Sequence, residues 1–327
     1  MKKTVLLTGC AGFIGSNFVK TICTRKEVKD HYDFVIIDSL TYAGKKENIE
    51  GELKAHSHLS FIQMDIRDKS QVHELFRTKS FYGVINFAAE SHVDRSIESP
   101  HIFVETNVLG TLNLLYCALE TFNKTGDFRF HQISTDEVYG TLSSTDPAFT
   151  EKTPLNPNSP YSASKTGADC LVRSFFETYG LPTIITRCSN NYGPYQVPEK
   201  FIPVVIRKAM NNETVPVYGN GMNVRDWIYV DDHNEGAWLA FTKGKAGEVY
   251  NLGGKTEKQN IDLAKIILKK LNKPESLLQF VTDRKGHDFR YAIDFTKAEK
   301  ELNWSPKMSF EQGIEKTIEW YTKNENR

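Results

Sequence analysis

The sequence lacks the features that mark several classes of protein. Its cysteines are few, odd in number and scattered, with no Cys-x-x-Cys spacing, which argues against a disulfide framework and against a zinc site. We therefore expect a reducing cytoplasm and no bound metal. Lys plus Arg equals Asp plus Glu, 41 of each, so the overall charge indicates neither a nucleic acid nor an acidic membrane as a partner. No unbroken apolar run approaches the roughly 20 residues needed to cross a bilayer, so no membrane segment is predicted.

The length and a regular alternation of patterns indicate the fold. A single core stops growing at roughly 250 to 300 residues, and the chain has 327, so two lobes are expected. In the first half, short apolar runs rich in β-branched residues alternate with longer amphipathic stretches, which is typical of βαβ units around a parallel sheet. We predict an α/β fold in which residues 1–187 form a Rossmann-type, doubly wound domain. Residues 188–327 should mostly form a smaller mixed α/β substrate lobe, from which 219–245 returns to the first domain.

Individual elements follow from the same alternation. Strands are predicted at residues 4–8, 34–37, 59–64, 83–87, 129–134, 183–187, 215–218 and 249–252, and helices at 13–24, 70–77, 102–122, 161–179, 201–210, 231–241 and 261–271. A final helix is expected to begin at Ser309, because Gln312 follows three residues later in a capping-box arrangement. Residues 190–203 are rich in Asn, Gly and Pro and are predicted to form a loop between the lobes. The helix at 102–122 is apolar on more than one face, so either the core or a partner subunit covers it.

A glycine pattern, GCAGFIG at residues 9–15, follows the first predicted strand and opens the first predicted helix. Gly9 permits a tight turn, Gly12 lets the chain approach a pyrophosphate, and Gly15 lets the helix pack close to the sheet. Free N–H groups and the helix dipole at this point favour an anion. Asp38 ends the second predicted strand, where a carboxylate binds adenosine ribose hydroxyls and repels a 2′-phosphate. The pattern therefore predicts NAD, in preference to NADP, as the cofactor.

Tyr161 and Lys165 lie one helical turn apart, so both side chains can project toward a common ligand. A lysine charge and a cationic nicotinamide ring both favour a tyrosinate. We therefore expect the pKa of Tyr161 to be lowered toward neutrality, so that the phenol can accept a proton from a sugar hydroxyl. The alternative is an ordinary pair on a helix surface. The glycine pattern and an acidic pair upstream, Asp136-Glu137, favour the catalytic interpretation.

The acidic pair lies directly beyond a predicted parallel strand, at the sheet edge where ligands of α/β proteins bind. Successive residues of a strand point to opposite faces, so both carboxyls can reach one ligand only if the chain leaves the extended form near Thr135. Gly140, a few residues on, favours such a turn. The alternative for Asp136-Glu137 is a solvated acidic loop.

Taken together, these segments resemble the extended short-chain dehydrogenase/reductase family. The resemblance rests on the glycine pattern and on residues 86–96 (NFAAESHVDRS), 134–140 (STDEVYG) and 161–165 (YSASK), and it continues through 188–194 (CSNNYGP), 223–227 (NVRDW) and 283–288 (DRKGHD). It therefore runs essentially from end to end. Within the family, the acidic pair makes the chain similar to the 4,6-dehydratases that act on dTDP-glucose, because related epimerases need no such pair.

The resemblance implies a lyase reaction in which bound NAD is regenerated within each turnover. Tyr161 takes the sugar O4 proton while a hydride passes from C4 to NAD, with Thr135 hydrogen-bonded to O4 and Lys165 holding the nicotinamide ribose. Glu137 then removes the C5 proton while Asp136 protonates the leaving C6 hydroxyl, after which the hydride returns to C6 and a proton to C5. Two such roles require Asp136 to be protonated and Glu137 to be ionised. The implied product is dTDP-4-keto-6-deoxyglucose, a precursor for deoxysugar and polysaccharide biosynthesis.

Binding residues are implied in the same way. The NAD contacts would be Gly9, Gly12, Phe13, Ile14, Gly15, Asp38, Ser39, Leu40, Thr41, Asp65, Ile66, Phe87, Ala88, Ala89, Ser91, Thr106, Tyr161, Lys165 and Asn191. The substrate contacts would be Ser91, Thr135, Asn190, Lys200, Phe201, Pro216, Tyr218, Arg225, Asn260, Arg284 and His287. Without the family, Asp65 and Ile66 are placed to flank the adenine, and a solvated loop acid is the alternative for Asp65. Arg225 is then either a ligand or a surface partner of Asp226, and His287 is a structural residue. His92 and Asp94 are interpreted as scaffold.

Two other functions remain open at this point. The same reaction could act on another nucleotide hexose, such as UDP-N-acetylglucosamine. A protein of another class, an inactive NAD-binding sensor or scaffold, would have lost proton-transfer residues that are all present here. The resemblance also implies a homodimer joined through the helices at 102–122 and 161–179.

Overall fold

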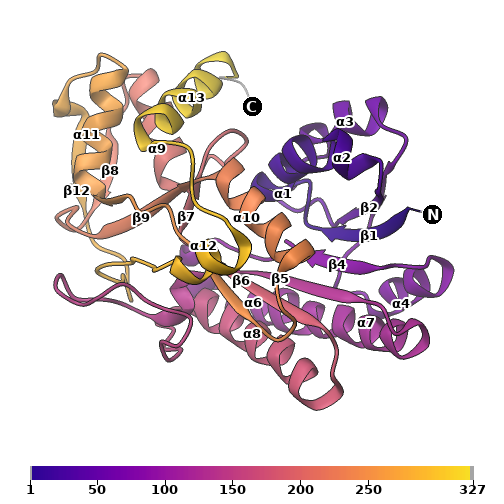
Figure 1. Ribbon diagram of the computed structural model, residues 1–327. Helices are drawn as coiled ribbons and strands as arrows, with labels where there is room; N and C mark the ends of the chain where they lie inside the picture. Colours follow the sequence, from indigo (N-terminus) through magenta and orange to yellow (C-terminus); the bar gives the residue numbers. More distant parts are fainter. Residues whose placement is uncertain (1, 325–327) are drawn as a thin grey trace.

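A seven-stranded parallel sheet runs through the centre of the protein (Figure 1). The computed structural model describes residues 2–324. The strands are β1 (Lys3–Thr8), β2 (Tyr32–Asp38), β3 (Leu59–Gln63), β4 (Gly83–Asn86), β5 (Arg129–Thr135), β6 (Thr183–Cys188) and β10 (Val249–Leu252). Their order is β10-β6-β5-β4-β1-β2-β3, and each neighbouring pair is parallel. The order runs outward from β1 and β4 in both directions, so the predicted doubly wound Rossmann arrangement is confirmed.

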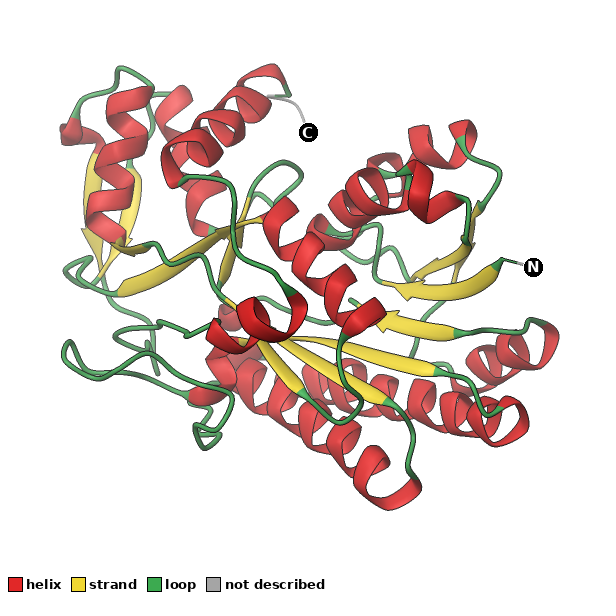
Figure 2. Ribbon diagram, in the orientation of Figure 1, coloured by secondary structure: helices red, strands yellow, loops and turns green. Residues whose placement is uncertain are grey.

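Helices cover both faces of this sheet (Figure 2). One face is covered by α4 (Lys69–Thr78), by a long helix at Pro100–Thr125 and by α8 (Pro160–Tyr179). The other face is covered by α1 (Phe13–Phe18) with its π-helical continuation (Val19–Cys23), α2 (Lys26–Lys29), α3 (Glu50–Ala55) and α10 (Val230–Lys243). Strands covered on both faces must be apolar on both, and four consecutive residues of β2, from Phe34 to Ile37, are buried for this reason.

The long helix consists of α6 (Pro100–Phe103), a π-helical segment, η3 (Val104–Gly110), and α7 (Thr111–Thr125). By length and composition alone this helix could cross a membrane, although polar residues interrupt its apolar sequence. One such helix is weak evidence for a membrane span. A core helix passes the same test, and Leu114, Leu115 and Ala118 of this helix are fully buried against the sheet.

A C-terminal lobe lies beyond the carboxyl ends of the central strands (Figure 1) and contains two small sheets with their helices. One sheet has the order β11 (Glu257–Gln259), β9 (Val224–Tyr229), β7 (Asn190–Tyr192), and the other pairs β12 (Leu278–Val281) with β8 (Val215–Tyr218). The helices are α9 (Phe201–Met210), α11 (Asn260–Lys270) and α13 (Phe310–Lys323), and shorter elements elsewhere are α5 (Val93–Glu98), α12 (Thr296–Leu302) and 3-10 turns at Lys46–Asn48, Asp136–Tyr139 and Glu275–Leu277. The hydroxyl of Ser309 accepts a hydrogen bond from the Gln312 amide (3.3 Å), so the predicted start of the last helix is confirmed.

The loop predicted at residues 190–203 is wrong at its first residues. Asn190–Tyr192 forms β7 because it pairs with residues of β9, from Trp227 to Tyr229, more than thirty positions along the chain. Local sequence cannot reveal such a pairing. It matters for function because β7 carries two of the predicted site residues, Asn190 and Asn191, to the sheet edge.

Two histidines are fully buried between the central sheet and α10. His131 of β5 places its Nε2 atom 3.0 Å from Oγ1 of Thr186, and His233 of α10 places Nδ1 3.2 Å from Oδ1 of Asn234. The Asn234 amide in turn donates to the carbonyl of Ile14, behind the glycine loop. Burial lowers the pKa of His131 to about 3 and that of His233 to about 4, from an ordinary 6.5.

These histidines should make the protein less stable as the pH falls. Unfolded histidines take up protons near pH 6.5, whereas the buried ones do so only near 4 and 3, so the unfolded state binds more protons between these values. The associated stability is present above pH 6.5 and is lost progressively toward pH 4. Urea unfolding across this range should show the slope, and His233→Gln should reduce it. His73→Gln, at an exposed helix position, is the control. An unchanged slope in His233→Gln would contradict the assignment.

Candidate active site

The main cavity opens where the strand order reverses, between β1 and β4, and crosses the carboxyl ends of the parallel strands. Its volume is about 450 Å³, within the range of small-molecule sites. The predicted site residues that line it are Gly9, Gly12, Phe13, Ile14, Gly15, Asp38, Ser39, Thr41, Asp65, Ile66, Phe87, Ala88, Ala89, Ser91, Thr106, Thr135, Asp136, Glu137, Tyr161, Lys165, Asn190, Asn191 and Lys200. Those that do not line it are Leu40, Phe201, Pro216, Tyr218, Arg225, Asn260, Arg284 and His287.

The glycine loop brings backbone to the cavity wall. Gly9 has φ +69°, a conformation that side chains disfavour, and an added Cβ would lie 2.6 Å from the backbone of Ala88. The loop therefore packs directly on the chain that leaves β4. A Cβ on Gly15 would lie 2.6 Å from Cys10 Cα, so this glycine allows the first helix to start close to the strand. The first helix begins at Phe13 and points its N-terminus at the cavity.

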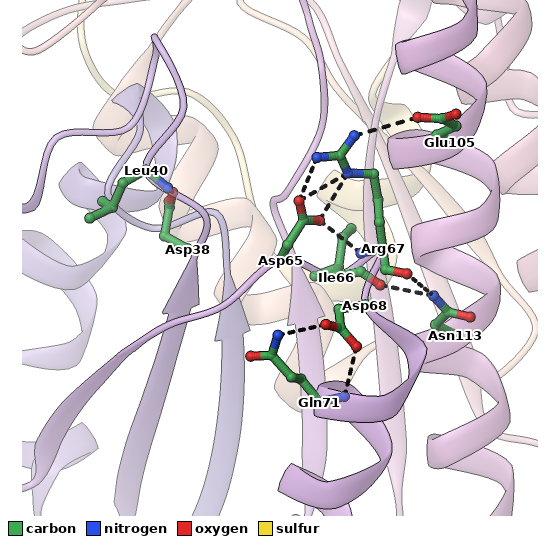
Figure 3. Close-up of polar contacts among 9 residues, drawn as sticks. All are labelled: Asp38, Leu40, Asp65, Ile66, Arg67, Asp68, Gln71, Glu105 and Asn113. Atoms are coloured by element: carbon green, nitrogen blue, oxygen red, sulfur yellow. Dashed lines mark hydrogen bonds and ion pairs between the residues drawn. The ribbon is translucent and has the colours of Figure 1, made fainter.

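Asp38 joins the glycine loop to the chain that follows β2. Its Oδ2 accepts a hydrogen bond from the Ala11 amide (2.9 Å) and its Oδ1 accepts one from the Leu40 amide (2.8 Å; Figure 3). Burial raises the pKa of Asp38, and these two amides oppose the rise. The carboxylate thus lines the cavity, and its two hydrogen bonds connect the glycine loop to the backbone at Leu40.

Asp65 is held by a neighbour that sequence reasoning missed. Arg67 forks over its carboxylate, with Nη2 2.6 Å and Nε 2.9 Å from Oδ2 (Figure 3). Burial alone would raise the pKa of Asp65, but the hydrogen bonds from Arg67 lower it below its ordinary value. Asn113 of α7 donates to the carbonyl of Ile66 (3.0 Å) and fixes this segment to the long helix. Asp65 is therefore an ordered ion-pair partner, which corrects its reading as a free loop acid.

A second residue that the sequence analysis missed is Asn107, in the π-helical segment of the long helix. Its Oδ1 accepts from the Glu90 amide (2.8 Å), while its Nδ2 donates to the Glu90 carbonyl (3.0 Å) and to Oγ of Ser164 (2.8 Å). The sequence carries no clear signal for this role, because other polar residues such as Glu105 and Asn113 lie on the same helix. It connects the loop after β4 to α8, the helix of Tyr161.

The start of α8 is set by its sequence. Ser159 caps the helix in a reciprocal box with Ser162, and Pro160 occupies the first helical position, where its missing N–H costs nothing. Tyr161 and Lys165 then face the cavity one turn apart. Lys165 is 3% exposed, and its Nζ donates to the carbonyl of Ile133 in β5 (2.7 Å).

The acidic pair lies on a single 3-10 turn directly after β5. Thr135 is still extended, with φ −136° and ψ 154°, and Asp136–Tyr139 then forms the turn, which ends at Gly140 with φ +89°. A Cβ on Gly140 would overlap the carbonyl of Asn156, so glycine is needed there. The predicted departure from the extended form at Thr135 is confirmed. It allows both carboxyls to line the same cavity.

The two carboxyls have unequal surroundings. Burial raises the pKa of Asp136 well above its ordinary value, and the charges of Glu137 and Asp226 add to the rise. Burial also raises the pKa of Glu137, but the cations Arg284 and Lys200 oppose it. The proton therefore resides preferentially on Asp136, whose Oδ2 has no hydrogen-bond partner among the residues described.

The surroundings of Tyr161 correct the expectation about its pKa. Burial raises this pKa well above its ordinary value, and the charge of Glu137 raises it further, while a hydrogen bond with Thr135 opposes the rise. The ammonium group of Lys165 donates to the Ile133 carbonyl. The sequence could not reveal how completely the phenol is buried.

Four predicted substrate residues, Ser91, Thr135, Asn190 and Lys200, line the cavity. Lys200 Nζ donates to the carbonyl of Ser91 (2.7 Å), which joins the C-terminal lobe to the loop after β4. The other predicted substrate residues lie in the C-terminal lobe beyond the cavity: Phe201 in α9, Pro216 and Tyr218 in β8, Arg225 in β9, Asn260 in α11, and Arg284 and His287 after β12.

Arg225 is not the surface partner of Asp226 that its sequence neighbours suggested. It is 5% exposed, donates to the carbonyl of Asp288 (2.9 Å) and lies 4.3 Å from the ring centre of Tyr291. Asp226 instead accepts from the amides of Gly254 and Thr256. The positive charge of this buried arginine acts on both Asp136 and Glu137 and opposes the rise in their pKa values.

Further residues line the cavity that sequence reasoning did not select, among them Glu90, Cys188 and Gln196. Gln196 donates from Nε2 to the carbonyl of Asn191 (2.9 Å), so it orders the edge of β7. Asp94 lies outside the cavity and contacts Tyr218 (3.5 Å) and Arg284 (3.9 Å) across the gap between the lobes.

Comparisons with known proteins agree with this geometry. The sequence profile of the family described as GDP-mannose 4,6 dehydratase matches residues 6–317. The dTDP-glucose 4,6-dehydratase of Xanthomonas campestris is 49% identical over 98% of this chain and 94% of its own length, and that of Neisseria meningitidis is 46% identical over 98% and 94%.

Solved structures give the same result. A dTDP-glucose 4,6-dehydratase from Streptomyces venezuelae with NAD bound superposes with a TM-score of 0.91 at 43% identity, covering 98% of this chain and 97% of that one. A UDP-glucose 4-epimerase from Thermotoga maritima has a TM-score of 0.88 at 29% identity and covers 99% and 100%. The fold is thus common to dehydratases and epimerases, and the sequence separates them. The chain belongs to the dTDP-glucose 4,6-dehydratases, within the wider GDP-mannose 4,6 dehydratase family.

Proposed function

We propose that this protein removes water from dTDP-glucose to give dTDP-4-keto-6-deoxyglucose, using a retained NAD. The observation that carries the proposal is the convergence of Asp136 and Glu137 with Tyr161 and Lys165 on one cavity. Fold similarity alone does not decide the reaction, because an epimerase superposes almost as well as the dehydratases. The acidic pair does decide it, since elimination across C5 and C6 needs a base for the C5 proton and an acid for the leaving hydroxyl.

The residues present fit NAD. The glycine loop packs directly on the chain after β4, which leaves backbone amides at the start of the first helix for a pyrophosphate, and Asp38 lies at the end of β2 for the adenosine ribose. Lys165 would hold the nicotinamide ribose. When bound, NAD supplies an acceptor for the C4 hydrogen, a donor for C6 and a positively charged ring near the phenol. Relatives from Streptomyces venezuelae and Bacillus anthracis were solved with NAD.

The protein's own groups move the protons. Tyr161 would accept the proton of the sugar O4 as a tyrosinate, with Thr135 as a hydrogen-bond partner. The positive ring that NAD would bring beside the phenol would favour this form against the burial that raises its pKa. Glu137 then takes the C5 proton, which the C4 ketone has made acidic. Asp136 gives its proton to the C6 oxygen as that group leaves. Burial favours the protonated form of Asp136, and the cations near Glu137 favour its ionised form, so the surroundings bias each carboxyl toward the protonation state its role needs.

The C-terminal lobe supplies the nucleotide site in this proposal, and residues 1–187 supply the cofactor domain. The charges of Arg225 and Arg284 act on Glu137, and both arginines would balance the negative charge of the diphosphate. Phe201 and Asn260 would contact the nucleotide, and Pro216 and Tyr218 would line the base pocket. His287 would approach the diphosphate together with Arg284. A second nucleotide hexose, such as a UDP sugar, would use the same chemistry and differ only at this end. The free cysteines suit a reducing cytoplasm.

We also propose a homodimer joined through the long helix and α8. Val104, Leu109 and Tyr116 on the long helix are about half exposed, and so is Tyr179 at the end of α8. Tyr116 and Tyr179 both contact the ring of Phe175, with centroid distances of 5.6 and 5.1 Å, so they form one aromatic patch across the two helices. An exposed apolar patch of this kind marks an interaction surface.

The reaction itself is tested on purified protein without added nicotinamide. Offered dTDP-glucose, it should form a 4-keto-6-deoxy product, because the cofactor returns to its starting redox state. A panel of dTDP-, UDP-, CDP- and GDP-hexoses, assayed for ketone formation, should show preference for dTDP-glucose. Preference for a UDP sugar would replace the substrate assignment, and no ketone from any hexose would refute the reaction.

The base is tested by Glu137→Gln. Water loss should fall by roughly 10²-fold or more, the usual contribution of general base catalysis. Oxidation at C4 should continue, so reduced cofactor should accumulate after mixing and be visible by its absorbance. Glu213→Gln, at an exposed position, is the control. Wild-type product formation by Glu137→Gln would remove this residue from the mechanism.

The dimer is tested by light scattering. Leu109→Glu should convert the dimer into a monomer, because a carboxylate would be buried in the interface without a partner. Phe280→Glu changes a residue of similar exposure in the C-terminal lobe and should leave the mass unchanged. A monomeric wild type would refute the proposal.

A further inference from the structure

A buried ion pair joins α8 to β6 next to the active site. Arg187 in β6 donates from Nε to Oδ2 of Asp169 over 2.9 Å, and the two side chains are 6% and 1% exposed. Asp169 follows Lys165 by one helical turn, so the two lie on the same face of α8. The second oxygen of Asp169, Oδ1, is buried with no hydrogen-bond partner in the part of the chain described. Asp169 is thus ion-paired with Arg187, and its charge also acts on the buried Lys165 one turn earlier.

The other end of Arg187 reaches the turn that carries the acidic pair. Its Nη1 donates to the hydroxyl of Tyr139 (3.0 Å), and its guanidinium lies 4.9 Å from that ring's centre. The Tyr139 hydroxyl donates in turn to Oδ1 of Asn251 in β10 (2.8 Å). Tyr139 is the last residue of the turn that begins with Asp136 and Glu137. Arg187 thus connects this turn to α8 through buried, charged hydrogen bonds.

We propose that Asp169 and Arg187 are positioning residues for the proton-transfer groups of the active site, an inference that rests on the proposed function. Asp169 supplies the negative charge that keeps the buried Lys165 ammonium protonated beside the cofactor. Arg187 fixes the turn of Asp136 and Glu137 relative to the helix that carries Tyr161.

Stability alone does not account for this pair. Replacing a buried ion pair by apolar side chains of similar volume is often neutral or stabilising, so burial of Asp169 and Arg187 is weak evidence for a stabilising role. Their location is the stronger argument. The pair joins α8, β6 and the 3-10 turn, which are the elements that carry Lys165, Cys188 and the acidic pair to the cavity.

The charge of Lys165 depends on what faces it from each neighbouring element. These groups are Asp169 on α8 and Cys188 on β6. Burial lowers the pKa of Lys165, and the carboxylate of Asp169 opposes this more than any other group.

The charge role is tested by Asp169→Asn. The alkaline limb of the kcat/KM profile should move to lower pH, since Lys165 loses its proton more easily, and kcat should fall roughly tenfold or more while KM for dTDP-glucose stays the same. Because Arg187 would be left unpaired, the double variant Asp169→Asn/Arg187→Gln is made alongside and should show the same displaced limb. Asp30→Asn, which breaks an exposed Lys–Asp pair of the same spacing, is the control and should match the wild type.

The positioning role is tested by Arg187→Lys and Tyr139→Phe. Both variants keep a positive charge at position 187 beside Asp169, so the alkaline limb of the kcat/KM profile should stay in place. Elimination should slow relative to oxidation, and reduced cofactor should build up during turnover. Backbone amides of residues 136–140 should exchange hydrogen faster with solvent, a measurement that needs no catalysis.

The outcomes separate the two roles from the proposed reaction. An unshifted pH profile in both Asp169 variants would overturn the charge role, and wild-type exchange at residues 136–140 in Arg187→Lys would overturn the positioning role. Failure of both Asp169 variants to fold would assign the pair a structural role and overturn the inference. If the wild type forms no ketone from any hexose, the proposed function fails, while the exchange measurement still decides the role of Arg187.

Discussion

Removal of two adjacent carboxyl groups from water is the constraint on which the rest of this structure depends. Burial raises the pKa of both Asp136 and Glu137, and two buried carboxylates so close cannot both be ionised at modest cost. The protein separates them by the charges it places around each. Lys200 and Arg284, both from the second half of the chain, oppose the rise at Glu137, whereas Asp136 receives the repulsion of Glu137 itself. The unequal pair therefore exists only when both lobes are assembled.

Much of this arrangement is predictable from local sequence. The glycine loop, the alternating strands and helices and the start of α8 are set by residues close together in the chain, and the structure has each where the pattern indicates. The turn after Thr135 could also be predicted, because two carboxyls that meet one ligand cannot both lie on an extended strand. Gly140, whose φ of +89° excludes most side chains, was the local signal for it.

What the sequence could not give depends on distant partners. Burial of Tyr161 by residues from several elements reverses the expected direction of its pKa shift. Asn190–Tyr192 became a strand because β9 lies beside it. The ion pair of Asp169 and Arg187 joins residues on a helix and a strand, which no local pattern connects. The fold class thus follows from the periodicity of apolar residues in the sequence, whereas the pKa shifts and ion pairs of the site follow from the packing of distant segments.

The scaffold leaves the choice of reaction to a few side chains. An epimerase superposes on this chain with a TM-score of 0.88, so the sheet edge and the glycine loop serve more than one chemistry. Removing and returning hydrogen at one carbon needs a single proton acceptor, and the tyrosine suffices. Elimination across two carbons needs an acid and a base at once, both held in fixed positions around the same sugar ring. Two carboxyls of nearly equal intrinsic acidity can serve both roles only if the protein makes their surroundings unequal, and here burial, the turn after β5 and the cations of the second lobe do so together.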